Sequence, residues 1–310
     1  MIRERKTMTC LKKGLLPLLI ICACAALLCA CATPNDPQGI ENVTSKGDNT
    51  YTLTYKDTDH DVGHEFILDL PAETKKAPLI LMLHGYGESA QIFRQTVHLE
   101  ELAVPKGYGV AYVTGAPNPF STGSSNGWNY GIDEQGNDDV AFLKNLARYL
   151  QKEYGFDPDR TFAVGFSNGA FMTHRLAVED PQTFAACVSV SGIMAPKVYD
   201  EISLRPRASF FQVTGEKDDV VPKNSDGSAK YAIAPAIEDV LDALAASNEL
   251  DQVEETEIGK ASVLTRMTGK KNKKQVWHLF NKNTRHAWPD EKLTGVNVNE
   301  LIMEFLDTQL

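Results

Sequence analysis

Cysteine is scarce in this chain outside its N-terminal stretch. The sequence has 310 residues and six cysteines, and only Cys187 lies beyond residue 31. A single cysteine cannot form an internal disulfide, so a hydrophobic core must stabilise the fold. Cys187 lies in the apolar run Phe184–Val190. In such a run a cysteine is far more often a small core residue than a nucleophile.

Basic residues are also fewer than acidic ones: the chain has 31 lysines and arginines and 41 aspartates and glutamates. Residues 1–30 hold five basic residues and one acidic residue, so their removal takes the formal charge from −10 to −14. A surface of this sign does not favour nucleic acid or anionic lipid as a partner. Internal repeats, coiled-coil heptads and long low-complexity segments are missing as well, which favours one globular domain.

The N-terminal segment has the composition of an export signal. A basic region precedes the apolar run Leu15–Leu28, which Pro17 interrupts and which is short for a membrane-spanning helix. We expect residues 1–30 to be a signal peptide of the lipoprotein type and the protein to be exported.

The end of this segment, Leu28-Cys29-Ala30-Cys31, resembles the lipobox of bacterial lipoproteins. We therefore expect Cys31 to be lipidated and residues 31–48 to form a flexible tether from the membrane to the domain. The protein would then be anchored on the cell surface or the periplasmic side. The alternatives are a lipid on Cys22 or Cys24, or ordinary cleavage that releases a secreted protein.

Two alternating runs, Tyr51–Tyr55 and Glu65–Leu70, predict an antiparallel hairpin. The connecting residues Asp59–Glu65 include two histidines and two aspartates, a composition that metal sites share. Gly63 and the alternation on both sides favour a turn and a strand instead. We expect a solvated loop here and no metal.

Beyond residue 78, short apolar runs alternate with amphipathic stretches. Six runs indicate buried strands: Leu79–Leu83, Tyr108–Val113, Arg160–Val164, Ala185–Val190, Ser209–Val213 and Gln275–Phe280. The clearest helical pattern spans Asp139–Tyr154. This alternation predicts an α/β fold: a mostly parallel sheet with helices on both faces, an antiparallel hairpin at its N-terminal edge, and one domain over residues 49–310.

The pattern Gly-x-Ser-x-Gly occurs twice, as GFSNG at 165–169 and GSSNG at 123–127. Ser167 follows a predicted strand and precedes a helical run, which is the strand–turn–helix setting of a nucleophile elbow. Ser125 lies in a segment rich in Pro, Gly and Asn, without a strand before it or a periodic helix after it. We predict that Ser167 is a nucleophile and that Ser125 is a loop residue.

A serine nucleophile needs a base, and the base needs an acid to orient it. In the α/β-hydrolase arrangement the acid and then the histidine follow the serine, each just past a strand end. Asp218 and Asp219 both follow the predicted strand Ser209–Val213, and His286 follows Gln275–Phe280. On this reasoning His286 is the base and either aspartate fits the acid.

The intermediate of such a reaction carries an oxyanion that backbone N–H groups stabilise. In this fold one donor comes from the loop after the first parallel strand and the other from the residue after the nucleophile. We predict the N–H groups of Tyr86 and Asn168. His84 is a second candidate base, but its position directly after the strand fits loop shaping better. A site of this kind needs no metal and no cofactor.

These motifs together resemble the α/β-hydrolase esterase group that contains secreted feruloyl esterases, acetyl xylan esterases and poly(3-hydroxybutyrate) depolymerases. The resemblance spans roughly residues 50–310 and rests on His84–Ala90, Trp128, Asp138–Leu143, Asp157–Arg160, Gly165–Gly169, Phe184–Ala186, Asp218–Pro222 and His286–Pro289. It implies a triad of Ser167, Asp218 and His286, and prefers Asp218 to Asp219.

The resemblance also implies a substrate class: feruloyl, cinnamoyl or acetyl esters on plant polysaccharide fragments. Neither a carbohydrate-binding module nor a Thr/Ser-rich linker is recognisable in the sequence, which favours small soluble esters. The run Asn281–Arg285 departs from the Gly-rich run common before the histidine, and it bears on the acceptance of bulky esters. Trp128 and Trp288 either stack on a substrate or pack their own loops.

Other functions stay open on the sequence alone. Within the same chemistry, the chain could be a hydroxybutyrate oligoester depolymerase or a peptidase. From another class, it could be a catalytically inactive surface lipoprotein that binds glycans.

Overall fold

The computed structural model describes residues 36–57, 60–117, 125–132, 136–202, 207–221 and 235–310. From Asn35 onward the chain is one compact unit. The predicted signal peptide and Cys31 lie outside the described residues, so both stay predictions. Within the described part, no helix combines the length and the apolar composition that crossing a bilayer requires.

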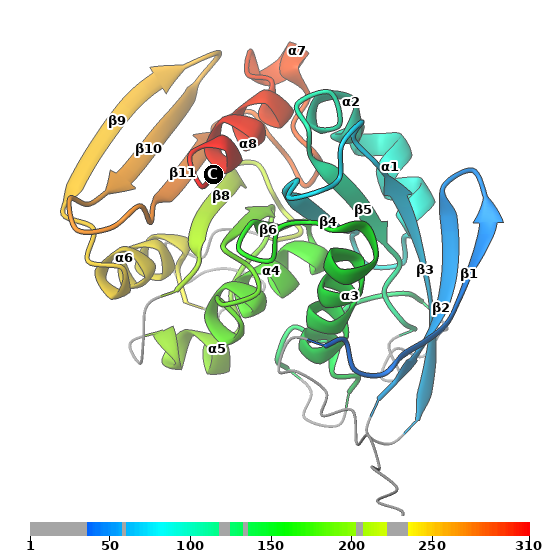
Figure 1. Ribbon diagram of the computed structural model, residues 1–310. Helices are drawn as coiled ribbons and strands as arrows, with labels where there is room; N and C mark the ends of the chain where they lie inside the picture. Colours follow the sequence, from blue (N-terminus) through cyan, green and yellow to red (C-terminus); the bar gives the residue numbers. More distant parts are fainter. Residues whose placement is uncertain (1–35, 58–59, 118–124, 133–135, 203–206, 222–234) are drawn as a thin grey trace, which may run out of the picture. The chain divides into compact units, whose positions relative to one another are not determined.

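An eleven-stranded sheet forms the centre of this unit (Figure 1). In chain order the strands are β1 Ile40–Gly47, β2 Thr50–Lys56, β3 Asp61–Asp69, β4 Leu79–Leu83, β5 Gly109–Val113, β6 Thr161–Phe166, β7 Ala186–Val190, β8 Ser209–Gly215, β9 Gln252–Ile258, β10 Ser262–Thr268 and β11 Val276–Asn281. Their order across the sheet is β1-β2-β3-β5-β4-β6-β7-β8-β11-β10-β9. The strands from β5 to β11 in this order are parallel, and antiparallel strands extend both edges.

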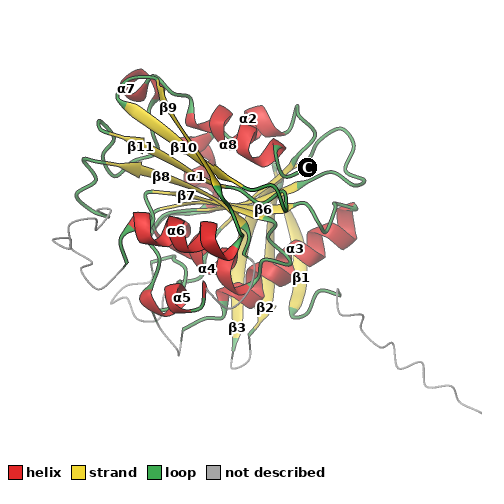
Figure 2. Cartoon of the chain, turned by 90° about the vertical axis from the view of Figure 1, so that its left-hand side faces the viewer, coloured by secondary structure: helices red, strands yellow, loops and turns green. Residues whose placement is uncertain are grey.

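Helices cover both faces of the sheet, as Figure 2 shows for α4 and α6 on one side and α8 on the other. The helices are α1 Ala90–Val97, α2 Glu100–Ala103, α3 Asp139–Tyr154, α4 Asn168–Glu179, α5 Pro196–Asp200, α6 Ile237–Ser247, α7 Glu291–Thr294 and α8 Val298–Asp307. The side chains of β4 alternate between two cores because strand side chains alternate in direction. Leu79, Leu81 and Leu83 belong to the core with α3, α4 and α6, whereas Ile80 and Met82 belong to the core with α1, α2 and α8.

The six apolar runs predicted as strands all form strands of the parallel centre, and the helix predicted over Asp139–Tyr154 is α3. The antiparallel pair β9–β10 at the far edge was not predicted. β9 reads Gln-Val-Glu-Glu-Thr-Glu-Ile and most of it is exposed. An edge strand without a buried face leaves no alternation of apolar residues to detect.

The flexible tether expected over residues 31–48 is wrong for its second part. Residues Ile40–Gly47 form β1, which pairs antiparallel with β2. Partly buried Ile40 and Val43 pack against the core, and the N–H of Gln38 donates to Asn145 Oδ1 at 2.9 Å. The folded domain therefore begins before residue 49.

The solvated loop expected over Asp59–Glu65 is also wrong in part, because β3 begins at Asp61. His64 is only 5% exposed, and its ring stacks on Phe142 with centroids 3.6 Å apart. Its Nδ1 lies 3.0 Å from the carbonyl of Thr114. Burial lowers the pKa of His64 to about 4, so it is a neutral core residue at pH 7.

Candidate active site

Ser167 lies at the sharp turn between β6 and α4. Its backbone has φ 50° and ψ −116°, a combination that costs free energy for a residue with a side chain. The turn is held by the Ser167 N–H, which donates to Val190 O on β7 at 3.0 Å. The strand–turn–helix setting predicted for Ser167 is therefore present.

The two glycines beside Ser167 are required by close backbone contacts. A Cβ atom on Gly165 would lie 2.2 Å from the carbonyl oxygen of Gly169. A Cβ atom on Gly169 would lie 2.1 Å from the carbonyl oxygen of Leu83, at the end of β4. The Gly-x-Ser-x-Gly pattern thus lets α4 begin directly against the end of β4.

Ser167, His286 and Asp218 are brought together from three separate loops. His286 Nε2 lies 2.9 Å from Ser167 Oγ, and His286 Nδ1 lies 2.9 Å from Asp218 Oδ2. The serine follows β6, the aspartate follows β8 and the histidine follows β11. These are carboxyl ends of parallel strands, which meet at one edge of the sheet.

The structure distinguishes the two candidate carboxylates. The Asp218 side chain is fully buried, and its Oδ1 accepts the N–H groups of Val220 at 3.0 Å and Val221 at 2.7 Å. These bonds hold the carboxylate against the imidazole of His286. Asp219 is exposed. Asp218 is therefore the carboxylate that contacts His286.

Of the two predicted oxyanion donors, Asn168 directly follows Ser167 in the chain, and Tyr86 lies in the loop after β4. Asn168 is the first residue of α4, where a backbone N–H has no acceptor inside the helix. Among the residues that the structure describes, neither the N–H of Asn168 nor that of Tyr86 forms a hydrogen bond. The N-terminus of α4 adds the positive end of a helix dipole at this position.

His84 is part of the loop framework. The Gly115 N–H donates to His84 Nε2 at 2.9 Å, so the ring proton is on Nδ1, which donates to Gly85 O at 2.6 Å. Burial lowers the pKa of His84 to about 4. Both ring nitrogens are occupied, which agrees with loop shaping rather than base catalysis.

Trp128 and Trp288 each pack their own loop. Trp128 is 1% exposed, and its indole N–H donates to His84 O at 3.1 Å. Trp288 donates its indole N–H to Asn299 Oδ1 on α8 at 3.0 Å and lies edge-on to Phe93 and Phe166. Phe166 in turn lies beside the His286 ring, with centroids 5.2 Å apart. Trp288 therefore supports the histidine loop from behind.

Asp139 begins α3 as predicted, and it is also a buried anchor. Asp138 caps α3, whereas Asp139 Oδ2 accepts the N–H of Asn129 at 2.7 Å. Asp139 is fully buried, and Asp139 Oδ1 has no partner among the described residues. Burial raises the pKa of Asp139 to about 7. No periodicity in the sequence marks this contact.

This raised pKa predicts a pH dependence of stability. The folded protein holds a proton on Asp139 that the unfolded chain loses near pH 3.8, so this residue lowers stability as the pH rises from about 4 to 7. Asp139→Asn keeps an acceptor for Asn129 and does not ionise. The difference in free energy of unfolding, variant minus wild type, should rise by about 1–4 kcal/mol between pH 4 and pH 8. Urea denaturation at both pH values measures this, and a difference that does not change with pH would contradict it.

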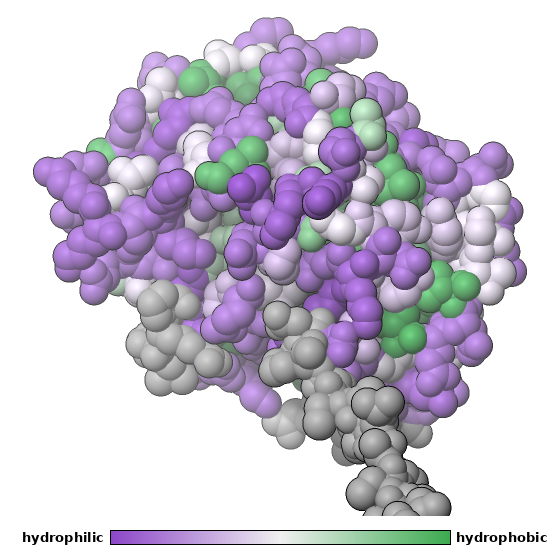
Figure 3. Space-filling view, in the orientation of Figure 1, coloured by the Kyte–Doolittle hydropathy of each residue, from purple (hydrophilic) through white to green (hydrophobic). Residues whose placement is uncertain are grey.

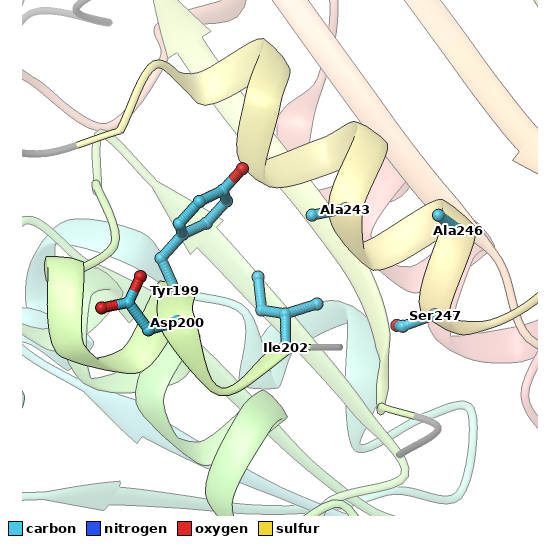
Figure 4. A pocket seen from close by; sticks show the side chains of 6 residues that line it. All are labelled: Tyr199, Asp200, Ile202, Ala243, Ala246 and Ser247. Atoms are coloured by element: carbon cyan, nitrogen blue, oxygen red, sulfur yellow. The ribbon is translucent and has the colours of Figure 1, made fainter. Parts of the chain in front are cut away.

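Two other features lie apart from the triad. A groove of about 490 Å³ lies between α5 and α6, and Figure 4 shows its lining residues Tyr199, Asp200, Ile202, Ala243, Ala246 and Ser247. His98, Glu100 and Glu101 form the one group of three metal-type ligands among the described residues. Glu100 already accepts the hydroxyl of Tyr112 at 2.7 Å and pairs with Arg94 at 3.4 Å. Neither feature includes a triad residue.

A protein family matches most of the chain. The family model described as esterase PHB depolymerase matches residues 64–270, about two thirds of the chain. The matched range contains Ser167 and Asp218 and ends before His286.

Two individual relatives each match about half of this chain. The bifunctional acetylxylan esterase/xylanase XynS20E of Neocallimastix patriciarum is 30% identical over 145 residues, covering 47% of this chain and 20% of that protein. Feruloyl esterase B of Piromyces equi is 28% identical over 152 residues, covering 48% of this chain and 28% of that protein. The chain thus spans less than a third of the length of these two curated relatives.

A solved structure is similar over most of the chain. The acetyl xylan esterase from Aspergillus awamori superimposes with a TM-score of 0.58 at 15% identity, covering 87% of this chain and 99% of that one. At this identity the likeness concerns the fold, and it confirms the predicted α/β-hydrolase class.

Proposed function

The chain belongs to the esterase PHB depolymerase family, and from this premise we propose that it is a serine carboxylic-ester hydrolase that works through an acyl-enzyme. One observation carries the proposal. His286 bridges Ser167 Oγ and Asp218 Oδ2 at 2.9 Å on each side, while the strained turn presents the serine. A hydroxyl, an imidazole and a buried carboxylate in this order are the groups that nucleophilic acyl transfer requires.

In the first half-reaction, Ser167 Oγ attacks the ester carbonyl carbon and His286 Nε2 takes the hydroxyl proton. The imidazolium that forms is stabilised by Asp218 across its Nδ1–H. The backbone N–H groups of Tyr86 and Asn168 bind the oxyanion. His286 then gives its proton to the departing alcohol, and the acyl group stays on the serine.

In the second half-reaction, water replaces the alcohol. His286 Nε2 accepts a proton from the water as its oxygen attacks the acyl carbon. The second tetrahedral intermediate occupies the same oxyanion site, and its collapse returns the proton to Ser167 and releases the acid.

The substrate class that we favour is a feruloyl, cinnamoyl or acetyl ester on small plant polysaccharide fragments. Relatives named as acetylxylan and feruloyl esterases support this class. On the face drawn in Figure 3, hydrophilic residues predominate and apolar residues form separate patches. A solid hydrophobic polyester would need a continuous apolar surface, and this face does not present one.

A panel of substrates tests the assignment: methyl ferulate, acetylated xylo-oligosaccharides, hydroxybutyrate oligomers and an aminoacyl p-nitroanilide. We expect kcat/KM to be highest for a feruloyl or acetyl ester and to vanish in a Ser167→Ala preparation. Preference for hydroxybutyrate oligomers or for the anilide would contradict the proposed substrate class. No turnover of any member would favour the inactive glycan-binding scaffold.

For the location, we propose an exported protein anchored through a lipid on Cys31, because the sequence around this residue has the lipobox pattern. In the expressing cell, the full chain should fractionate with membranes and the Cys31→Ala variant should not. Identical fractionation of the two would remove the anchor from the proposal.

A further inference from the structure

The end of the second Gly-x-Ser-x-Gly segment, Asn126 and Gly127, has no place in the reaction described above, yet it lies beside the site. Asn126 forms hydrogen bonds to the segment that contains Tyr86, and Trp128 forms hydrogen bonds to that segment and to Asn168, with Gly127 between them. We propose that this run, here called the Asn126–Trp128 clamp, positions the two N–H groups of the oxyanion hole. The inference deepens the proposed function and rests on it.

On one side, the clamp holds the residue after the nucleophile. The N–H of Trp128 donates to Asn168 Oδ1 at 2.7 Å, and Asn168 Nδ2 donates to Trp128 O at 3.2 Å. This pair of reciprocal bonds is buried, so water competes little with it. It fixes the Asn168 side chain and with it the peptide at the start of α4.

On the other side, the clamp brackets Tyr86. Trp128 Nε1 donates to His84 O at 3.1 Å, ahead of Tyr86 in the chain. Behind it, the Gly87 N–H donates to Asn126 O at 2.8 Å, and Asn126 Nδ2 donates to Glu88 O at 2.9 Å. The peptide that carries the Tyr86 N–H is therefore held at both of its ends.

The space between these contacts leaves little room for a side chain at position 127. A Cβ atom there would lie 3.2 Å from Asn168 Oδ1 and 3.3 Å from the Tyr86 ring. The N–H of Gly127 also donates to Ala116 O at 2.9 Å, which ties the clamp to the segment after β5. The clamp contacts both donor segments at one closely packed point.

Asn129, the residue that follows the clamp, is held by an acidic and a basic side chain. Asn129 donates its N–H to Asp139 Oδ2, and its carbonyl accepts from Arg175 Nη1 at 2.6 Å. Arg175 lies on α4, the helix that Ser167 begins, and it also pairs with Glu179 at 2.7 Å. The clamp is thus joined to the same helix at two places, Asn168 and Arg175.

The clamp predicts that Asn168→Ala slows the chemical step and leaves substrate binding nearly intact. Alanine keeps the backbone N–H donor but removes both bonds to Trp128. Because oxyanion stabilisation depends on donor position, we expect kcat to fall about 10- to 100-fold while KM changes by less than about three-fold. The affinity for a trifluoromethyl ketone, which forms a tetrahedral adduct on the serine, should fall in parallel with kcat/KM.

Rates are expressed per active site, titrated to completion with a fluorophosphonate, so that loss of folded protein does not count as loss of catalysis. Trp128→Phe keeps an aromatic ring and both backbone bonds to Asn168 but removes the donor to His84 O, and we expect a smaller fall of about 3- to 10-fold. The matched control is Asn145→Ala on α3, which removes the bonds of an asparagine side chain to Gln38 and Ala141. Its kcat per titrated site should stay within about two-fold of wild type.

The outcomes separate the two proposals. If both Asn168→Ala and Trp128→Phe keep kcat per site and ketone affinity within about two-fold of wild type, the clamp has no positioning role, although the esterase stands. If Asn168→Ala does not fold, Trp128→Phe decides alone by the same criterion. A wild-type protein that neither hydrolyses esters nor takes the label overturns the proposed function and the clamp with it.

Discussion

Ser167→Ala is expected to lower kcat for ester hydrolysis by about 10⁴-fold or more, because the variant has no oxygen to form the acyl-enzyme. The loss should appear in kcat and leave the fold unchanged, since alanine removes one hydroxyl from a turn that is held by backbone bonds and glycines. Initial rates on p-nitrophenyl acetate, with circular dichroism of the same preparation, measure both effects.

The matched control is Ser125→Ala, which changes the serine of the other Gly-x-Ser-x-Gly segment. It should retain activity within about two-fold of wild type, apart from small effects through the neighbouring clamp. Substantial activity in Ser167→Ala, with loss in Ser125→Ala, would reverse the assignment of the nucleophile.

Asp218→Asn should be the second large effect, with kcat lowered by about 10⁴-fold. The N–H groups of Val220 and Val221 keep the oxygen of the asparagine at the Oδ1 position, so its NH₂ group takes the place of Oδ2 beside His286 Nδ1. An NH₂ group there requires Nδ1 to be an acceptor, which puts the ring proton on Nε2. That tautomer cannot take the proton of Ser167.

Asp219→Asn is the control for Asp218→Asn, because the two residues are adjacent and the charge change is identical. Asp219 is exposed, so we expect a change of less than about two-fold. Steady-state kinetics of both variants on one soluble ester decides the point. Equal losses in the two would mean that the negative charge of the loop matters rather than the contact with His286.

The turn at Ser167 was predictable because its requirements are local. Gly165 and Gly169 are needed by contacts within a few residues of Ser167 and with the end of β4, and they flank the serine in the sequence. The short apolar runs were predictable too, because parallel strands that are buried on both faces are apolar along their whole length. Local packing leaves a local pattern in the sequence.

The choice between Asp218 and Asp219 could not be made from residue types or spacing. Both follow β8 in one turn, and the choice depends on how this turn meets the loop after β11. The unpredicted pair β9–β10 lies between these strands in the chain, although β8 and β11 are neighbours in the sheet. Resemblance to a family favoured Asp218, and the coordinates show the contact itself.

The clamp and Asp139 were missed for a related reason. Trp128 and Asn168 are 40 residues apart, and their bonds run between a loop backbone and a side-chain amide. Contacts of this kind follow neither a helical nor a strand period. The Trp128 ring was a candidate for substrate stacking in the sequence, whereas its burial makes it a structural donor to the loop after β4.

Covalent labelling of the nucleophile tests the proposed chemistry most directly. The full chain is treated with a fluorophosphonate probe, and the modified residue is located by peptide mass spectrometry in wild type, Ser167→Ala and Ser125→Ala. We expect one probe per molecule on Ser167, lost in the first variant and retained in the second. Labelling of Ser125, or no labelling of a folded wild-type protein, would contradict a mechanism built on Ser167.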